Sequence, residues 1–120
     1  MTVLAEIVGR IRRGGPYPDH AKSLQTAVVD VLRRDGWEVD VEVAVPSRGS
    51  DGQRGRIDMV LSHDGAPVAA IELDSKNPRT KSLFKVRHHA APVKLVVVRR
   101  HMALHEVEPG VWCFGVEVRS

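Results

Sequence analysis

Two apolar runs around a polar turn, RIDMVLSHDGAPVAAIELDSK (56–76), constrain the fold of this chain more than any other segment. Runs of this length on either side of a turn predict a β-hairpin. The first run carries Asp58, and the second carries Glu72 and Asp74, where a core strand would have aliphatic residues. Because side chains alternate along a strand, Glu72, Asp74 and Lys76 share one face if the second strand stays extended. The hairpin therefore predicts a row of charged side chains on one face of a sheet.

The length of the hairpin loop decides whether Asp58 joins that row. A five-residue loop, 63–67, places Asp58 directly opposite Glu72, with about 5 Å between their Cβ atoms. A two-residue turn at 64–65 puts Asp58 one residue out of phase, unless a bulge restores the register. We favour the longer loop, because Pro67 lacks the amide hydrogen that a tight closing pair needs.

Two carboxylates this close would each hold a proton more tightly unless a positive charge lies between them. Either a divalent cation or Lys76 could supply that charge. Mg²⁺ and Mn²⁺ prefer carboxylate and carbonyl oxygens, which Asp58, Glu72 and the Leu73 carbonyl can provide, with Asp74 as a further ligand. A hairpin held by ion pairs alone, without metal, is the structural alternative.

These residues resemble the PD-(D/E)xK, or restriction-endonuclease-like, nuclease superfamily, over roughly residues 22–99. Asp58 matches the first acid of its pattern and Glu72 in AAIELD matches the second. The third position departs from the pattern, since it holds Asp74, with Lys76 two residues further on. The resemblance implies Mg²⁺- or Mn²⁺-dependent hydrolysis of DNA phosphodiesters, with Asp58, Glu72, Asp74 and Lys76 as catalytic residues. It also places Gln25 where many members carry a glutamate on the first helix, as a further catalytic residue.

The rest of the chain can be divided into further elements by its hydrophobic periodicity. Helical spacing of apolar residues predicts helices at 3–13, 20–34 and about 80–89, and strict alternation predicts a strand at 37–45 whose valines share one face while Glu38, Asp40 and Glu42 face solvent. An aliphatic run at 93–100 predicts a buried strand parallel to the second hairpin strand, because a helix separates the two. A closing strand is expected at 110–118. The resemblance makes this an α/β fold with a restriction-endonuclease-like αβββαβ core, a mixed sheet flanked by helices, an extra N-terminal helix and a C-terminal strand.

Length and composition fit this interpretation. A chain of 120 residues with 42% hydrophobic content predicts one domain, 1–120. No apolar run approaches the roughly 20 residues of a membrane span and no signal peptide is evident, so we expect a cytoplasmic protein without a membrane partner.

Basic residues suggest the partner. The net charge is +3, with basic residues concentrated in a Gly- and Ser-rich loop and around the third helix. Aromatic residues are only 4% of the chain, so phosphate contact is favoured over base stacking. The residues expected to bind nucleic acid are Arg48, Arg54, Arg56, Arg79, Lys81 and Lys85.

Three functions remain open at this point. The first is a metal-dependent DNA endonuclease, for which a homodimer would suit the cutting of both strands. The second is a catalytically impaired relative that still binds nucleic acid, and the third is a protein-interaction domain that oligomerises through the first helix.

Overall fold

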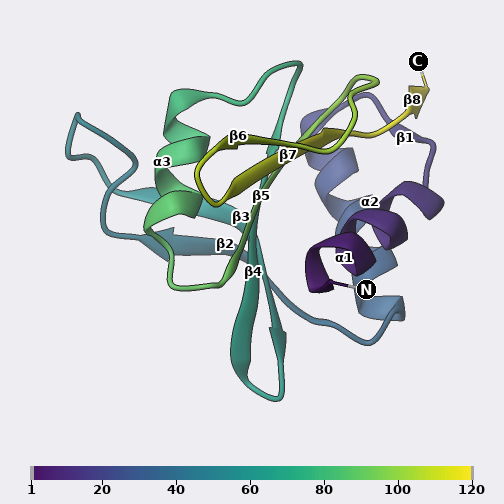
Figure 1. The fold of residues 1–120 in the computed structure, drawn as a ribbon, viewed down its shortest axis with the longest axis horizontal. Helices are drawn as coiled ribbons and strands as arrows, with labels where there is room; N and C mark the ends of the chain where they lie inside the picture. Colours follow the sequence, from purple (N-terminus) through teal and green to yellow (C-terminus); the bar gives the residue numbers. More distant parts are fainter. Residues whose placement is uncertain (1, 120) are drawn as a thin grey trace.

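A six-stranded mixed sheet forms the centre of the computed structural model, which describes residues 2–119 (Figure 1). Its strand order is β2–β3–β4–β5–β7–β6. The strands are β2 (Glu38–Val45), β3 (Gly55–His63), β4 (Ala66–Asp74), β5 (Val93–Val98), β6 (His105–Glu108) and β7 (Val111–Gly115). The strands β2, β3 and β4 are antiparallel neighbours, whereas β4, β5 and β7 run parallel. The expected order of three antiparallel strands, a helix and a parallel strand is confirmed.

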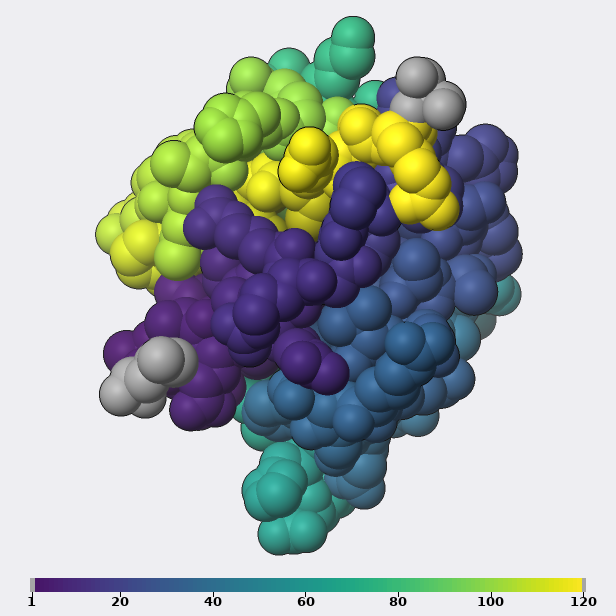
Figure 2. Space-filling view, turned by 90° about the vertical axis from the view of Figure 1, so that its right-hand side faces the viewer, coloured from purple at the N-terminus to yellow at the C-terminus, as the bar shows by residue number. Residues whose placement is uncertain are grey.

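Helices cover both faces of the sheet, as the long apolar strands require. The helices α1 (Val3–Arg13) and α2 (Ala21–Arg34) pack on one face, and α3 (Thr80–His88), the crossover between β4 and β5, packs on the other (Figure 1). Figure 2 shows the first of these faces, where α1 lies between α2 and the C-terminal segment. The protein is therefore an α/β domain with a mixed sheet and three helices. None of the helices in residues 2–119 has the length and apolar character needed to cross a membrane.

Two hydrophobic clusters lie on opposite sides of the sheet. The α1–α2 side contains Leu24 and Phe114, both fully buried, together with alternate residues of the strands. The α3 side contains Val86 and the other set of alternate strand residues, including Val96. At about 25 cal/mol per Å² of apolar surface, clusters of this kind supply most of the folding free energy.

The hairpin loop is shorter than expected. His63 pairs with Ala66 across a two-residue turn, in which Asp64 and Gly65 both have positive φ, 51° and 78°. These values fit the type I′ turn that an Asp-Gly dipeptide favours. The predicted five-residue loop is therefore wrong: the turn has two residues, and a bulge in β4 supplies the offset that the longer loop would have given. The bulge shifts the pairing between Leu61 and Ser62 and restores the expected phase.

The strand β2 also departs from the expected pattern. Val39 belongs to the α1–α2 cluster, but Val43 and Val45 pack against the α3 cluster, so the valines do not share one face. The change occurs at Glu42, whose φ of 52° lies in the left-handed region that non-glycine residues rarely adopt. On β3, Met59 and Ile57 divide between the two clusters in the same way. Both strands therefore change face at the level of Glu42 and Asp58.

The C-terminal region contains more strands than the single one expected. The segment forms an antiparallel pair of β6 and β7, and then a short β8 (Val118–Arg119) that pairs in parallel with β1 (Tyr17–Pro18). The two-residue strands β1 and β8 are too short to show a hydrophobic period, so periodicity could not predict them.

Candidate functional site

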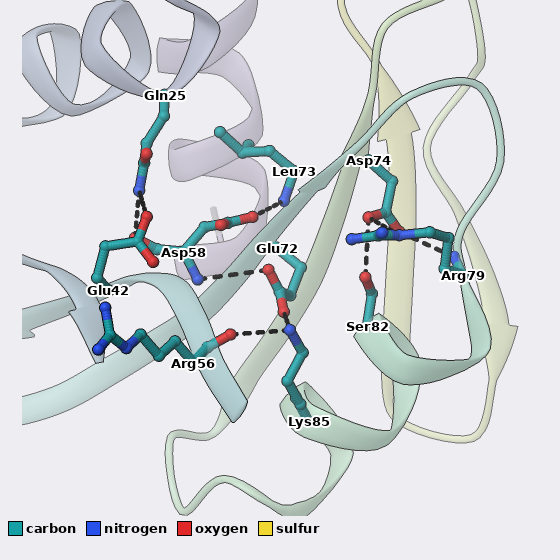
Figure 3. A network of polar contacts seen from close by, with 10 residues as sticks. All are labelled: Gln25, Glu42, Arg56, Asp58, Glu72, Leu73, Asp74, Arg79, Ser82 and Lys85. Atoms are coloured by element: carbon teal, nitrogen blue, oxygen red, sulfur yellow. Dashed lines mark hydrogen bonds and ion pairs between the residues drawn. The ribbon is translucent and has the colours of Figure 1, made fainter. Parts of the chain in front are cut away.

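The two acids singled out by sequence lie together where β3 separates from β4. Pairing between these strands ends at Met59 and Ile71, although β3 begins at Gly55, so the strands form a fork. Asp58 and Glu72 are the next residues on either side of this fork. The Asp58 amide donates to Glu72 Oε2 at 3.3 Å, and the Leu73 amide donates to Asp58 Oδ2 at 2.7 Å (Figure 3). The predicted proximity of Asp58 and Glu72 is thus present.

Glu72 is deeply buried and strongly perturbed. Its side chain is only 1% exposed and faces α3. Burial, a hydrogen bond between the Asp58 and Glu72 side chains and the negative charge of Asp58 raise the pKa of Glu72 to about 8, while Lys85 acts in the opposite direction. At neutral pH Glu72 therefore holds a proton that a cation could replace.

Lys85 supplies the positive charge at this site. Its ammonium contacts Glu72 Oε1 and donates to the Arg56 carbonyl oxygen at 2.8 Å (Figure 3). Its side chain is 12% exposed. Although Oε1 contacts the ammonium, it accepts no hydrogen bond of good geometry from residues 2–119. A ligand can therefore reach this oxygen only by displacing the Lys85 ammonium.

Gln25 on α2 connects the helix to the fork. Its Nε2 donates to the Asp58 carbonyl oxygen at 2.9 Å and to Glu42 Oε1 at 3.2 Å (Figure 3). Glu42 also lies 3.8 Å from the Lys22 ammonium. The left-handed backbone at Glu42 turns its carboxylate toward α2, so it is not one more member of a solvated outer face. The expectation of a solvent-facing Glu42 is corrected by this contact.

Asp74 has another set of partners. Its buried carboxylate accepts hydrogen bonds from the Arg79 amide at 2.8 Å, from Arg79 Nε at 3.0 Å and from the Ser82 hydroxyl at 2.8 Å. These donors lie at the start of α3, so Asp74 fixes the first turn of that helix on the end of β4. Asp74 shares the face of Glu72, as expected, but its oxygens point to the helix start (Figure 3).

Lys76 lies outside the acid pair. The strand β4 ends at Asp74, so the extended face expected to carry Lys76 does not continue to it. Lys76 is exposed, and its carbonyl oxygen accepts a hydrogen bond from Arg100 Nε at 2.6 Å. The cation beside Glu72 is Lys85 instead. Lys85 reaches Glu72 because of the way α3 crosses β4. Asp74, two residues after Glu72 on β4, holds Ser82, which lies three residues before Lys85 on α3.

The remaining basic residues lie on the loop before β3 and on α3. Arg48 pairs with Asp51 at 3.2 Å, and Lys81 reaches the same carboxylate at 4.0 Å. Arg54 and Arg56 are exposed. The pKa of Asp51 is lowered, mainly by the Gln53 amide and then by Arg48. The loop thus offers basic side chains next to the fork, with one acid among them.

The donor set for a metal is small. Among residues 2–119, no three His, Cys, Asp or Glu side chains approach one another closely enough to hold a metal ion. Two carboxylates are nevertheless enough for Mg²⁺, which usually keeps several waters and completes its shell with substrate phosphate. An ion at the fork would displace the Lys85 ammonium from Glu72 Oε1 and the proton held by Glu72. The structure shows the Leu73 amide at the site, bound to Asp58, and Asp74 turned toward α3.

The chain matches no protein-family model, no curated protein and no solved structure.

Proposed function

We propose that this protein is a metal-dependent DNA endonuclease with a restriction-endonuclease-like core. The observation that carries the proposal is the Asp58–Glu72 pair at the fork, with Lys85 against it. Acids on two neighbouring strands, followed by a crossover helix and a parallel strand, are the arrangement that the resemblance implies. The basic residues beside the fork suit a phosphodiester substrate.

In this proposal Asp58 and Glu72 hold Mg²⁺ or Mn²⁺. When bound, the ion would lower the pKa of a water and neutralise charge on the scissile phosphate. Glu72 must lose its proton to bind a cation, and burial makes that loss unfavourable in the free protein. Cation binding and proton release are therefore coupled at this residue.

Lys85 takes the role that the sequence assigned to Lys76. An ammonium next to the carboxylate pair can stabilise negative charge that develops on the phosphate, and it can orient the attacking water. Gln25 holds the Asp58 backbone from the other side and so keeps the first acid in place. The exposed Lys81, Arg54 and Arg56 would contact the flanking phosphates, and Arg48 would join them if it left Asp51.

A second candidate is a nucleic-acid-binding domain without nuclease activity. The contact between Lys85 and Glu72 favours it, because the ammonium already lies against the Glu72 oxygen that a metal would need. Asp74 is likewise engaged by α3. In this alternative Lys85 takes the place of the metal beside Glu72, and the basic loop still holds DNA.

Supercoiled plasmid with Mn²⁺ separates the two candidates. The endonuclease should nick the plasmid, and Asp58→Asn or Glu72→Gln should reduce nicking by more than about 100-fold, since even groups that only orient metal ligands are worth roughly 10–100-fold. The matched control is Asp64→Asn, because Asp64 lies on the exposed hairpin turn and should not affect the rate. Nicking that survives in both site variants refutes the site. DNA retardation that weakens with salt and ignores metal, without nicking, supports the second candidate.

A further inference from the structure

A cavity lies beyond the carboxylate pair, at the carboxyl ends of β4 and β5. It has a volume of about 160 Å³ and is lined by the first turn of α2, the end of β4, Arg79 and Arg99. A single water needs only roughly 10–15 Å³ of such space. Carboxyl ends of parallel strands are where open α/β sheets bind ligands. We call this cavity the Arg99 pocket.

Arg99 is the residue of this pocket whose surroundings call for a ligand. Its side chain is 17% exposed, and its guanidinium makes no hydrogen bond to another residue in the range 2–119. Its nearest counter-charge is Asp19 Oδ1, at 3.6 Å from Nη1, which is too long for a hydrogen bond. A guanidinium has five N–H donors in a planar fork. The Arg99 nitrogens are not among the buried unpaired atoms of residues 2–119, so these donors are open to solvent and to an anion that enters the pocket. An oxyanion in the pocket would satisfy them.

Arg79 provides a second guanidinium from the other wall. Its Nε donates to Asp74 Oδ1, so its terminal nitrogens extend beyond that contact, and the side chain is 67% exposed. Asp74 also lines the pocket, but its oxygens already accept from Arg79 and from Ser82. Arg79 compensates the Asp74 charge through Nε, so what it offers an anion is its terminal N–H donors, beside those of Arg99.

The start of α2 adds donors to the same wall. Ala21 and Leu24 line the pocket, and the preceding residue, His20, makes no side-chain capping hydrogen bond. The unpaired amides of a first helical turn favour an anion. This wall supports the two arginines and would be insufficient without them.

We propose that the Arg99 pocket binds a phosphate group through Arg99 and Arg79. The source is either a free phosphate or the backbone of a nucleic acid whose neighbouring nucleotides lie over the fork, since Leu73 lines the pocket and donates its amide to Asp58. The site requires neither a metal nor the carboxylate pair. It can therefore hold even if the endonuclease proposal fails.

The test measures melting temperature and DNA binding for the intact chain and three variants. Arg99→Gln removes the central cation, and Asp19→Asn removes the acid that competes for it. Arg34→Gln is the control, because Arg34 also pairs with an aspartate, Asp30, but lies at the other end of α2. In the first arm, the melting temperature of each protein is measured in inorganic phosphate and in chloride of equal ionic strength. In the second, a short DNA duplex is titrated without metal over a range of salt concentrations.

Inorganic phosphate about tenfold above its dissociation constant should raise the melting temperature by roughly 3–6 °C. Arg99→Gln should lose this rise, Asp19→Asn should increase it, and Arg34→Gln should keep it. Each shift is compared with the same variant in chloride, so a loss of intrinsic stability does not obscure the result. If the source is a DNA backbone, Arg99→Gln should instead lower the salt slope of duplex binding by about one. Arg99→Gln that matches Arg34→Gln in both arms overturns the proposal.

Discussion

Replacing Glu72 with glutamine should stabilise the fold even though it removes the central acid of the site. The pKa of Glu72 is about 8 in the folded protein and 4.5 for an ordinary glutamate. At pH 7 the folded protein therefore holds a proton on Glu72 that the unfolded chain has released. Each pH unit of this difference costs about 1.4 kcal/mol, so the penalty at pH 7 is about 3 kcal/mol. Glutamine has the shape of the protonated glutamate and no such penalty.

The sign of the effect follows from the raised pKa. Because the folded state binds the proton more tightly, the wild-type protein loses stability as pH rises from about 4.5 to about 8. The gain from Glu72→Gln should consequently be below about 1 kcal/mol at pH 5 and reach about 3 kcal/mol at pH 7. The effect of Lys85 is already included in the pKa of about 8 for Glu72. Lys85 also contacts a neutral side chain in both proteins at pH 7, the protonated glutamate of the wild type and the glutamine of the variant.

Urea denaturation at pH 5, 7 and 8.5 measures this gain directly. Glu117→Gln is the control, since Glu117 is exposed and should show no pH-dependent gain. Added Mg²⁺ or Mn²⁺ should stabilise the wild type and not the variant, if the ion binds Glu72. A variant that is less stable than the wild type, or a gain that is independent of pH, would contradict the reasoning.

Three other predictions concern the same layer of the fold. Asp74→Ala should destabilise the protein by roughly 2–3 kcal/mol in urea denaturation, because the buried Ser82 hydroxyl and the start of α3 lose their acceptor. Gly115→Ala should be more damaging, at roughly 3 kcal/mol or more in the same assay, since a Cβ there would lie 1.8 Å from the Arg100 carbonyl oxygen. Plasmid nicking with Mn²⁺ should rise between pH 6.5 and 8.5, because the metal must displace the Glu72 proton; a flat profile would argue against Glu72 as a ligand.

Much of the architecture could be predicted from periodicity. Strict alternation over 37–45 predicts a strand, and the aliphatic run at 93–100 predicts a buried parallel one; both are present as β2 and β5. These two predictions agree with the structure because periodic burial is a property of the whole segment and does not depend on any single residue. The hairpin loop could not be predicted as safely, since a one-residue bulge compensates for a tighter turn and leaves the register of Asp58 unchanged.

The candidate site was predictable only in part. Asp58 and Glu72 follow from the strand pattern, because each is fixed by its own strand. Lys85 does not, since its place against Glu72 depends on how a helix crosses the sheet. The position of the Glu42 side chain could not be predicted either, because no neighbouring residue indicates a left-handed backbone conformation within a strand.

The change of face shared by β2 and β3 has a mechanical consequence. Val39 and Met59 pack in the α1–α2 layer, whereas Val43 and Ile57, on the other side of this level, pack with the α3 layer. The two layers are thereby tied through a single level of the sheet, which is the level of Asp58. Loss of packing in either layer would therefore disturb the backbone at Asp58. The distance between Asp58 and Glu72 thus depends on the packing of both layers.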